Sequence, residues 1–146
     1  MARLVAGGVR LRAQVDRRWP KRDKRSDGWI GDKAHQSRPS DHNPDNRGWV
    51  HAIDIDADLN GPGKGRAAAQ QLADEIVAYA ASGLPGSDRI KYVVFNDRVA
   101  SGTYPKSRWV WRGNGYGHFD HIHVSFTAAA EKDGRKYPLP IFDLLP

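Results

Sequence analysis

The sequence predicts an α+β fold, with a mainly antiparallel central sheet backed by helices in a single domain over residues 1–146. Several short segments alternate apolar and polar residues, as half-buried strands do, whereas only one long segment has helical periodicity. A length of 146 residues is typical of one domain that buries its core without disulfides, which this chain cannot form because it has no cysteine.

The N-terminal third is the hardest part to assign. Residues 2–19 place isolated apolar residues among arginines, a pattern that fits a strand or a helix, and Pro20 ends it. Residues 20–48 are rich in Gly, Pro, Asp, Asn and Ser. We expect a long irregular segment there, kept ordered by the packing of Trp19 and Trp29.

The clearest strand is residues 50–56, VHAIDID. Its alternation places Ala52, Asp54 and Asp56 on one face and Ile53 and Ile55 on the other. The following sequence, DLNGPGKG, ends the strand.

One helix and further strands follow. The apolar spacing predicts an amphipathic helix over residues 66–82, closed by Gly83 and Pro85. In the tail, with Pro138, Pro140 and the sequence IFDLL, we expect a last short turn packed on the body. Strands are expected at residues 90–96, near 98–100, at 108–112 and at 122–126.

The formal net charge of +6 comes from the first third of the chain. Residues 1–47 hold 12 Lys or Arg against 6 Asp, while residues 48–146 hold 11 of each sign. The run RRWPKRDKR at 17–25 indicates attraction to an anionic polymer, such as nucleic acid or a phosphate-rich cell wall, or else a solvated surface. Because zinc-finger spacing and aromatic RNA-binding motifs are absent, we expect no specific nucleic-acid partner.

No segment reaches the roughly 20 apolar residues of a membrane span. The apolar stretch from Leu4 to Val9 is too short and too rich in glycine for a signal peptide. We therefore expect a protein that is made in the cytoplasm and has no membrane partner. We also expect a monomer, which no feature of the sequence tests. The chain is compatible with a whole protein or with one domain of a longer one.

Two patches combine histidines with aspartates beside an expected strand. They are SDHNPDNRGWVHAIDID at 40–56 and HFDHIHVSF at 118–126, and together they hold five of the six histidines. An open zinc site takes three ligands from His, Cys, Asp and Glu and leaves its fourth position to water. His42, Asp54 and His123 are residues of the nitrogen and oxygen types that a chain without cysteine must use.

The second patch carries further polar groups. Alternation in the strand at 122–126 places His121, His123 and Ser125 on one face. Asp120 lies just before this strand, where a loop can bring its carboxylate near a metal-bound water as a general base. Single histidines in a strand or a turn are more often surface residues, so the prediction depends on the concurrence of the two patches.

These motifs resemble those of the LAS zinc peptidases, the group of D-Ala-D-Ala carboxypeptidases, L-Ala-D-Glu endopeptidases and VanX-like enzymes that act on peptidoglycan. The first family motif is matched by Ser40-Asp41-His42, Gly48 and Ala52-Ile53-Asp54. The second motif, an acidic residue three positions before a histidine, is matched by Asp120 and His123. The sequences of both patches are also similar to those of peptidase domains of actinobacterial phage endolysins.

The resemblance implies a zinc-dependent hydrolase. Its zinc ligands would be His42, Asp54 and His123, its general base Asp120, its oxyanion-stabilising cation Arg38, and its auxiliary residue His121, which would bind the intermediate or orient Asp120. Eleven residues separate the first two ligands where the family motif has six, so His35 is an alternative first ligand. His51 has the wrong strand parity for that role.

By this likeness the substrate is peptidoglycan, and we expect an endolysin-like endopeptidase that cleaves the stem peptide or cross-link at the bacterial cell wall. A D-Ala-D-Ala carboxypeptidase is the alternative with the same chemistry. An alternative of another class is a non-catalytic basic module that binds cell wall or nucleic acid.

Two further sequences look like ligand-binding loops. DADLNG at 56–61 begins like a calcium loop but has Ala67 where that loop requires a bidentate Glu. GPGKGR at 61–66 lacks the spacing and the Ser or Thr of a phosphate-binding loop. We expect both to be turns.

Overall fold

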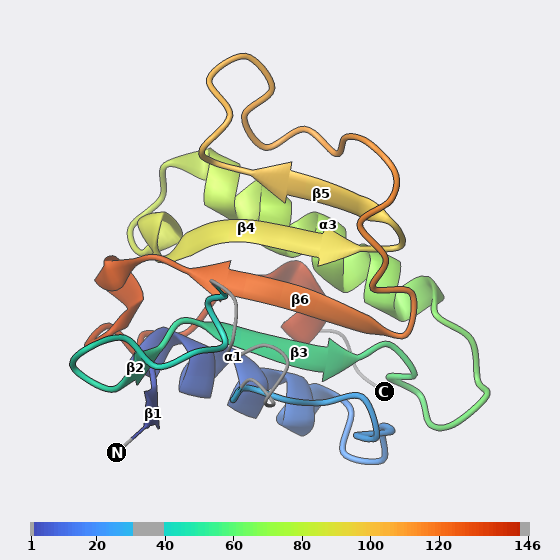
Figure 1. Cartoon of the computed structure of the whole chain (residues 1–146). Helices are drawn as coiled ribbons and strands as arrows, with labels where there is room; N and C mark the ends of the chain where they lie inside the picture. Colours follow the sequence, from blue (N-terminus) through green and yellow to red (C-terminus); the bar gives the residue numbers. More distant parts are fainter. Residues whose placement is uncertain (1, 31–39, 144–146) are drawn as a thin grey trace.

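A four-stranded antiparallel sheet forms the centre of the computed structural model, which describes residues 2–30 and 40–143 (Figure 1). Its strand order is β3-β6-β4-β5, and a small parallel pair, β1-β2, lies beside it. The strands are β1 (Arg3–Leu4), β2 (Trp49–Val50), β3 (Ala52–Asp56), β4 (Ile90–Phe95), β5 (Arg98–Ser101) and β6 (His121–Phe126). The predicted α+β class is confirmed.

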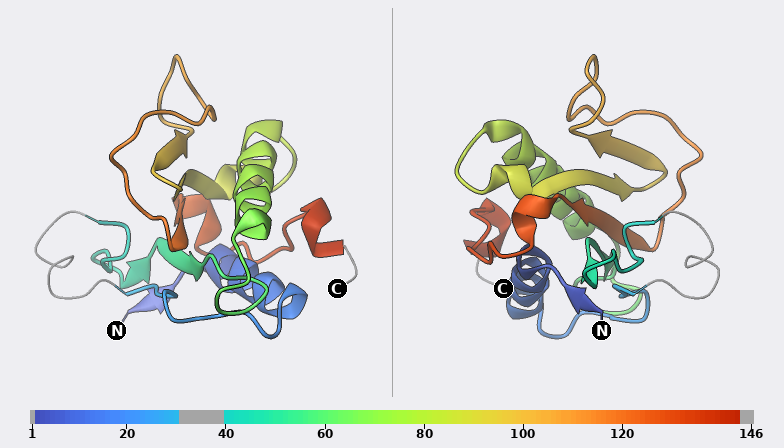
Figure 2. Two further views of the ribbon diagram at one scale, coloured as in Figure 1. Left: turned by 90° about the vertical axis from the view of Figure 1, so that its right-hand side faces the viewer. Right: turned by 60° about the vertical axis from the view of Figure 1, so that its left-hand side comes forward.

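Within the described ranges, two α-helices cover one face of the sheet, α1 (Ala6–Arg18) beside β3 and α3 (Ala67–Ser82) beside β4 (Figure 2). Gly83 ends α3 in the left-handed conformation, with φ of 74°, as the sequence predicts. The described residues also form three one-turn helices: η1 (Ser87–Arg89), η2 (Ala128–Ala130) and η3 (Pro140–Asp143). The last of these is the expected turn of the tail.

The sequence of the N-terminal segment fits a strand or a helix. In the structure it forms the two-residue strand β1 followed by the helix α1. The buried face of α1 begins with Gly7 and Gly8 and continues through Leu11 and Val15. A Cβ atom on Gly7 would lie 2.8 Å from the hydroxyl oxygen of Tyr137, so only glycine permits this close approach. Half of the buried face therefore has no side chain, which is why the apolar periodicity is faint.

The predicted strand faces are confirmed. Ile53 and Ile55 of β3 belong to the core with Ile122 and Val124 of β6, on the side that the helices cover. The residues between them point to the opposite face. One face of the sheet is therefore an apolar core, and the other is free to carry polar chemistry.

The prediction of a strand at 108–112 is wrong. Trp109 has a φ of 59°, which breaks the extended run, and only Arg112 pairs with Val99 as an isolated bridge. The predicted turns are present: the chain from 57 to 66 is irregular, and the amide of Asp58 donates to the Asp56 carboxylate. Asp56, Asp58 and Asp23 lie close together, but their carboxylates accept hydrogen bonds from backbone amides and from arginines.

A fully buried arginine fixes the C-terminal segment to the sheet. Arg89 has no exposed surface, and it donates to the carbonyl oxygens of Gly86 at 2.7 Å and Arg135 at 2.6 Å. Its guanidinium also lies 3.9 Å from the ring centre of Tyr137. The charge is thus solvated by backbone carbonyls and an aromatic ring rather than by water.

We predict that Arg89→Ala lowers the free energy of unfolding by about 3 kcal/mol, because it leaves buried carbonyl oxygens without a donor. Urea unfolding of the variant beside Arg135→Gln, an exposed arginine of the same segment, measures this difference. A loss for Arg89→Ala no larger than that of the control would contradict the assigned role.

Candidate metal centre

The register of two strands brings the first pair of candidate ligands together. In the antiparallel pairing of β3 with β6, Asp54 lies directly opposite His123. Side chains of directly opposed residues leave the sheet on the same face, here the one away from the helices. The two residues are 69 positions apart in the sequence, and their proximity follows from the pairing alone.

The third side chain comes from an irregular segment that docks on the outer edge of β3. Gly28 forms an isolated bridge with Asp54, whose amide donates to the Gly28 carbonyl at 2.7 Å. The next residue, Trp29, offers its carbonyl oxygen to the Nδ1 atom of His42 at 3.0 Å. His42 is thus oriented by a backbone group that the edge of the sheet positions.

The enlarged loop between His42 and Asp54 folds as a compact turn. The Asp45 carboxylate accepts hydrogen bonds from the amides of Arg47 and Trp49, both at 2.9 Å, and Gly48 has a positive φ of 86°. The extra residues are absorbed in this turn, and β2 then pairs with β1. The longer spacing therefore does not prevent the first motif from converging.

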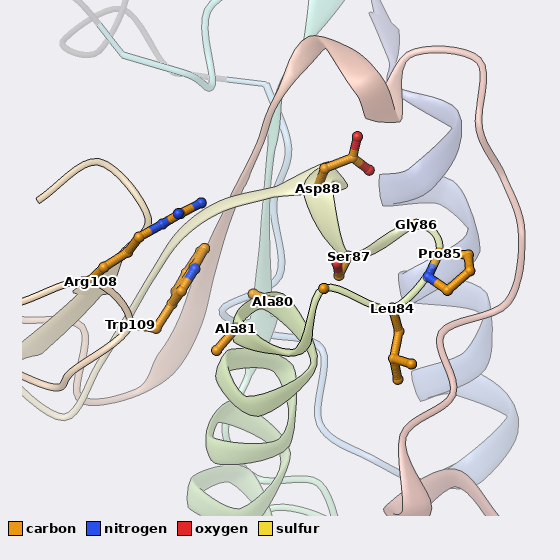
Figure 3. A pocket seen from close by; sticks show the side chains of 10 residues that line it. Ala80, Ala81, Leu84, Pro85, Gly86, Ser87, Asp88, Arg108 and Trp109 are labelled. Atoms are coloured by element: carbon orange, nitrogen blue, oxygen red, sulfur yellow. The ribbon is translucent and has the colours of Figure 1, made fainter. Parts of the chain in front are cut away.

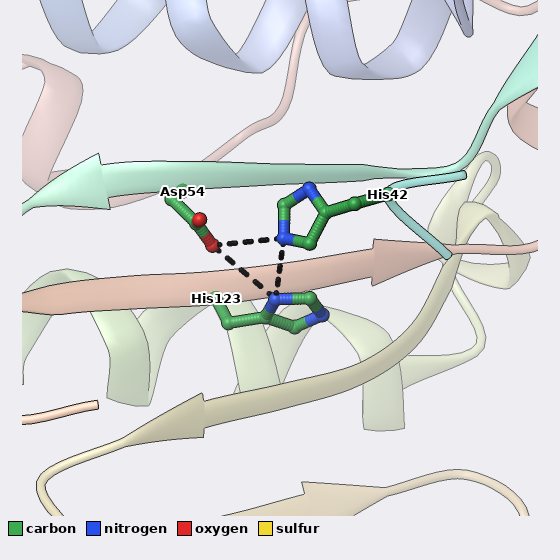
Figure 4. A group of neighbouring side chains, drawn as sticks. All are labelled: His42, Asp54 and His123. Carbon is green, nitrogen blue, oxygen red and sulfur yellow. Dashed lines mark hydrogen bonds and ion pairs between the residues drawn. The ribbon is translucent and has the colours of Figure 1, made fainter. Parts of the chain in front are cut away.

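The three candidate ligands form a nearly equilateral triangle of donor atoms (Figure 4). His42 Nε2 lies 3.1 Å from His123 Nδ1, and the Oδ1 atom of Asp54 lies 3.2 Å from each of these nitrogens. A tetrahedral zinc ion with bonds of about 2.0 Å holds its ligand atoms about 3.3 Å apart. The geometry of the donor set fits zinc with one position left open.

The outer nitrogens of both rings are engaged, which leaves the inner nitrogens for a metal. The Trp29 carbonyl can only accept a hydrogen bond, so Nδ1 of His42 carries the proton there. His123 Nε2 lies 2.7 Å from the Ser125 hydroxyl, whose further partner is the phenol of Tyr92. Hydrogen bonds of this kind fix the tautomer of histidine ligands in metal sites.

The triangle is electrostatically coupled. Burial alone would raise the pKa of Asp54, but hydrogen bonds from His123 and His42 hold its pKa far below the usual value. The pKa of His42 is raised, because the effect of the Asp54 carboxylate outweighs that of burial. The pKa of His123 is lowered, chiefly by burial. The ionised, largely buried carboxylate of Asp54 therefore faces the rings of His42 and His123. A cation bound by these three side chains would displace protons from the ring nitrogens that face the carboxylate.

Asp120 and His121 lie together beside this triangle. The Asp120 carboxylate contacts Nδ1 of His121 at 2.8 Å, and Nε2 of His121 lies 3.7 Å from Oδ1 of Asp54. The hydrogen bond from His121 lowers the pKa of Asp120, whose side chain is 61% exposed. Nε2 of the imidazole thus faces the triangle, and the carboxylate orients the ring through Nδ1.

Two aromatic residues of the site were missed in the sequence. The Tyr92 ring stacks on His123 with 5.4 Å between centroids, and His118 lies edge-on to the rings of both His121 and His123. Alternation could have identified Tyr92, which pairs with Ser125 across β4 and β6. His118 has a positive φ of 61°, a local strain that no sequence pattern indicates.

Other predicted residues lie elsewhere. His51 binds Glu131 at 2.8 Å and takes no part in the triangle, as its parity indicates. Arg38 and the alternative ligand His35 lie outside the described residues. A cavity of about 660 Å³ at the end of α3, between Leu84 and Trp109, contains none of the triangle residues (Figure 3).

No protein-family model, curated protein or solved structure matches this chain. The likeness to LAS peptidases therefore rests on the two motifs. None of the helices in the described ranges has the length and apolar character to cross a membrane.

We predict that the purified protein binds one zinc ion per chain and that Asp54→Ala weakens zinc binding by more than about 100-fold, beyond the usual effect of losing an outer hydrogen bond. Titration against a competing zinc indicator measures both quantities. The control is His51→Gln, a histidine of the same patch outside the triangle. Equal losses in the two variants would rule out the assigned ligand set.

The outer hydrogen bond has its own test. Because Ser125 fixes the orientation of His123, we expect Ser125→Ala to weaken zinc binding by about 10-fold. The same titration applies, with Ser101→Ala as the control, a buried serine of β5 whose hydroxyl contacts Thr103. An unchanged affinity in Ser125→Ala would show that the ring keeps its orientation without the hydroxyl.

Proposed function

We propose that this protein is a zinc-dependent peptidase that hydrolyses peptide bonds in the peptidoglycan stem peptide or cross-link, as an endolysin-like endopeptidase. The observation that carries the proposal is the triangle of His42, Asp54 and His123, whose atoms have the spacing of three ligands of a tetrahedral ion. The two motifs that form it are those that resemble the LAS peptidases. A D-Ala-D-Ala carboxypeptidase is the alternative with the same site.

In this proposal the bound zinc supplies Lewis acidity, which polarises a carbonyl group and makes water more acidic. The chain supplies the proton transfer. His121 Nε2, which lies 3.7 Å from Oδ1 of Asp54, accepts the proton of the attacking water, and the ionised Asp120 stabilises the resulting imidazolium through Nδ1. The same proton then passes to the leaving amine.

The groups around the site support a role for this pair as a unit. His118 packs edge-on against His121 with 4.7 Å between ring centroids, which limits the rotation of the imidazole. Asp120 provides an anionic partner of low pKa, which remains ionised while the ring gains and loses a proton. The resemblance gives the role of general base to Asp120 alone. In this proposal His121 accepts the proton and Asp120 stabilises the protonated ring.

We predict that Asp120→Asn and His121→Gln each lower peptidoglycan hydrolysis by at least about 100-fold while zinc stays bound. Mass spectrometry of digested peptidoglycan is the measurement. New amino termini within the stem peptide or cross-link indicate an endopeptidase, and free D-alanine indicates a carboxypeptidase.

Asp88→Asn is the matched control, because Asp88 is an exposed aspartate just before β4, where β4 pairs with the end of β6 that is away from Asp120. Its activity should equal that of the unaltered protein. Zinc-loaded protein that releases neither product from peptidoglycan would refute the proposed function. Full activity in Asp120→Asn would instead refute only the proton-transfer role.

A further inference from the structure

A cationic groove lies on the surface of α1, the helix on the opposite side of the sheet from the metal triangle. It has a volume of about 420 Å³ and runs between α1 and the C-terminal segment. Its basic residues come from both: Arg10, Arg17 and Arg18 from α1, and Lys136 from the C-terminal segment. Asp143 is its one acidic residue.

None of these four cations has a carboxylate partner within 4.0 Å among the residues that the structure describes. Some cations elsewhere are paired, Arg22 with Asp16 and Asp27 and Lys91 with Asp41, whereas others such as Lys64 and Arg108 have no described carboxylate partner but do not line the groove. The groove thus gathers positive charge that the fold does not neutralise. Such a concentration of one sign attracts a ligand of the other.

Two of the arginines are held in place before any ligand arrives. Arg10 donates through Nε to the Gly134 carbonyl at 2.8 Å, and Arg18 donates through Nε to the Ile141 carbonyl at 2.9 Å. Between them, the Gln14 side chain exchanges two hydrogen bonds with the backbone of Tyr137. The terminal amino groups of both guanidiniums remain for an anion, and the fork suits the oxygens of a phosphate.

The arrangement favours a polymer over a single ion. Arg10, Gln14, Arg17 and Arg18 share one side of α1, and a rise of 1.5 Å per residue makes this row about 12 Å long. That length holds more than one phosphate of an extended chain. Phe142, the aromatic residue of the groove, packs edge-on against Trp19 rather than standing free to stack on a base.

We infer that this groove binds a base-free, linear phosphodiester polymer of the poly(glycerol phosphate) type. The inference goes beyond the proposed peptidase activity and does not depend on it, because none of the groove residues belongs to the metal triangle. The ligand class follows from four unpaired cations, two fixed guanidiniums and the absence of a free stacking ring among the groove residues.

The test is binding of the full chain to fluorescently labelled poly(glycerol phosphate), measured by anisotropy at about 50 mM salt and at higher salt. The double variant Arg17→Gln/Lys136→Gln removes two exposed charges that make no described hydrogen bond. We expect it to weaken binding at least tenfold and to reduce the salt dependence by about 1.4 in the logarithmic slope. The control Lys64→Gln/Arg108→Gln removes the same charge outside the groove and should change affinity less than twofold.

A second variant separates the guanidinium fork from charge alone. Arg10→Lys/Arg18→Lys keeps the net charge and should still weaken binding several-fold, because an ammonium group lacks the fork. Thermal unfolding of each variant establishes that it is folded.

Three outcomes would overturn the inference. One is the absence of binding at low salt, and another is an equal loss in the groove and control double variants, which would mean that net charge alone attracts the polymer. The third is tighter binding to a single-stranded oligonucleotide of equal charge, which would make nucleic acid the ligand. Activity on peptidoglycan is not a readout, so failure here leaves the proposed function untouched.

Discussion

The candidate metal centre depends on the register of β3 against β6. A shift of one residue in this pairing would turn Asp54 or His123 toward the core, because successive side chains in a strand point to opposite faces. The register is held on the other face by the apolar residues of the same strands, Ile53 opposite Val124 and Ile55 opposite Ile122. The hydrophobic core thus sets the position of two ligands to which it contributes no atom.

The third ligand depends on a different kind of constraint. His42 belongs to an irregular segment, and its ring is oriented by the Trp29 carbonyl, which the bridge between Gly28 and Asp54 places at the edge of β3. One aspartate therefore contributes its carboxylate to the triangle and its backbone to the strand that docks the loop. Folding of this loop and completion of the donor set are linked, since a cation held by all three side chains would also tie the loop to the sheet.

The sequence predicts those parts that depend on strand alternation. The faces of both motif strands, the exclusion of His51 and the helix ending at Gly83 all follow from local periodicity or turn chemistry. The helix at the N-terminus was ambiguous because two of its buried positions are glycines, of which Gly7 admits Tyr137 and Gly8 lies against Leu4 and Phe126. A contact between His121 and Asp120 was one of two roles that the family resemblance implies for His121. Alternation could not select it, because alternation fixes the face of a side chain and not the atom that it contacts.

Charge shows the same distinction between a local pattern and a three-dimensional arrangement. The basic run at 17–25 suggested one anion-binding segment, but Arg22 is buried between Asp16 and Asp27, and Arg25 contacts Asp23. These residues use their charge to hold the irregular segment that leads to Gly28. The cations of this run without a described ion pair are Arg17, Arg18 and Lys21, and the fold combines the first two with Arg10 and with the distant Lys136. Among the described residues of this run, some cations therefore have a structural role in the irregular segment that leads to Gly28, while Arg17 and Arg18 line an exposed groove on the opposite side of the sheet.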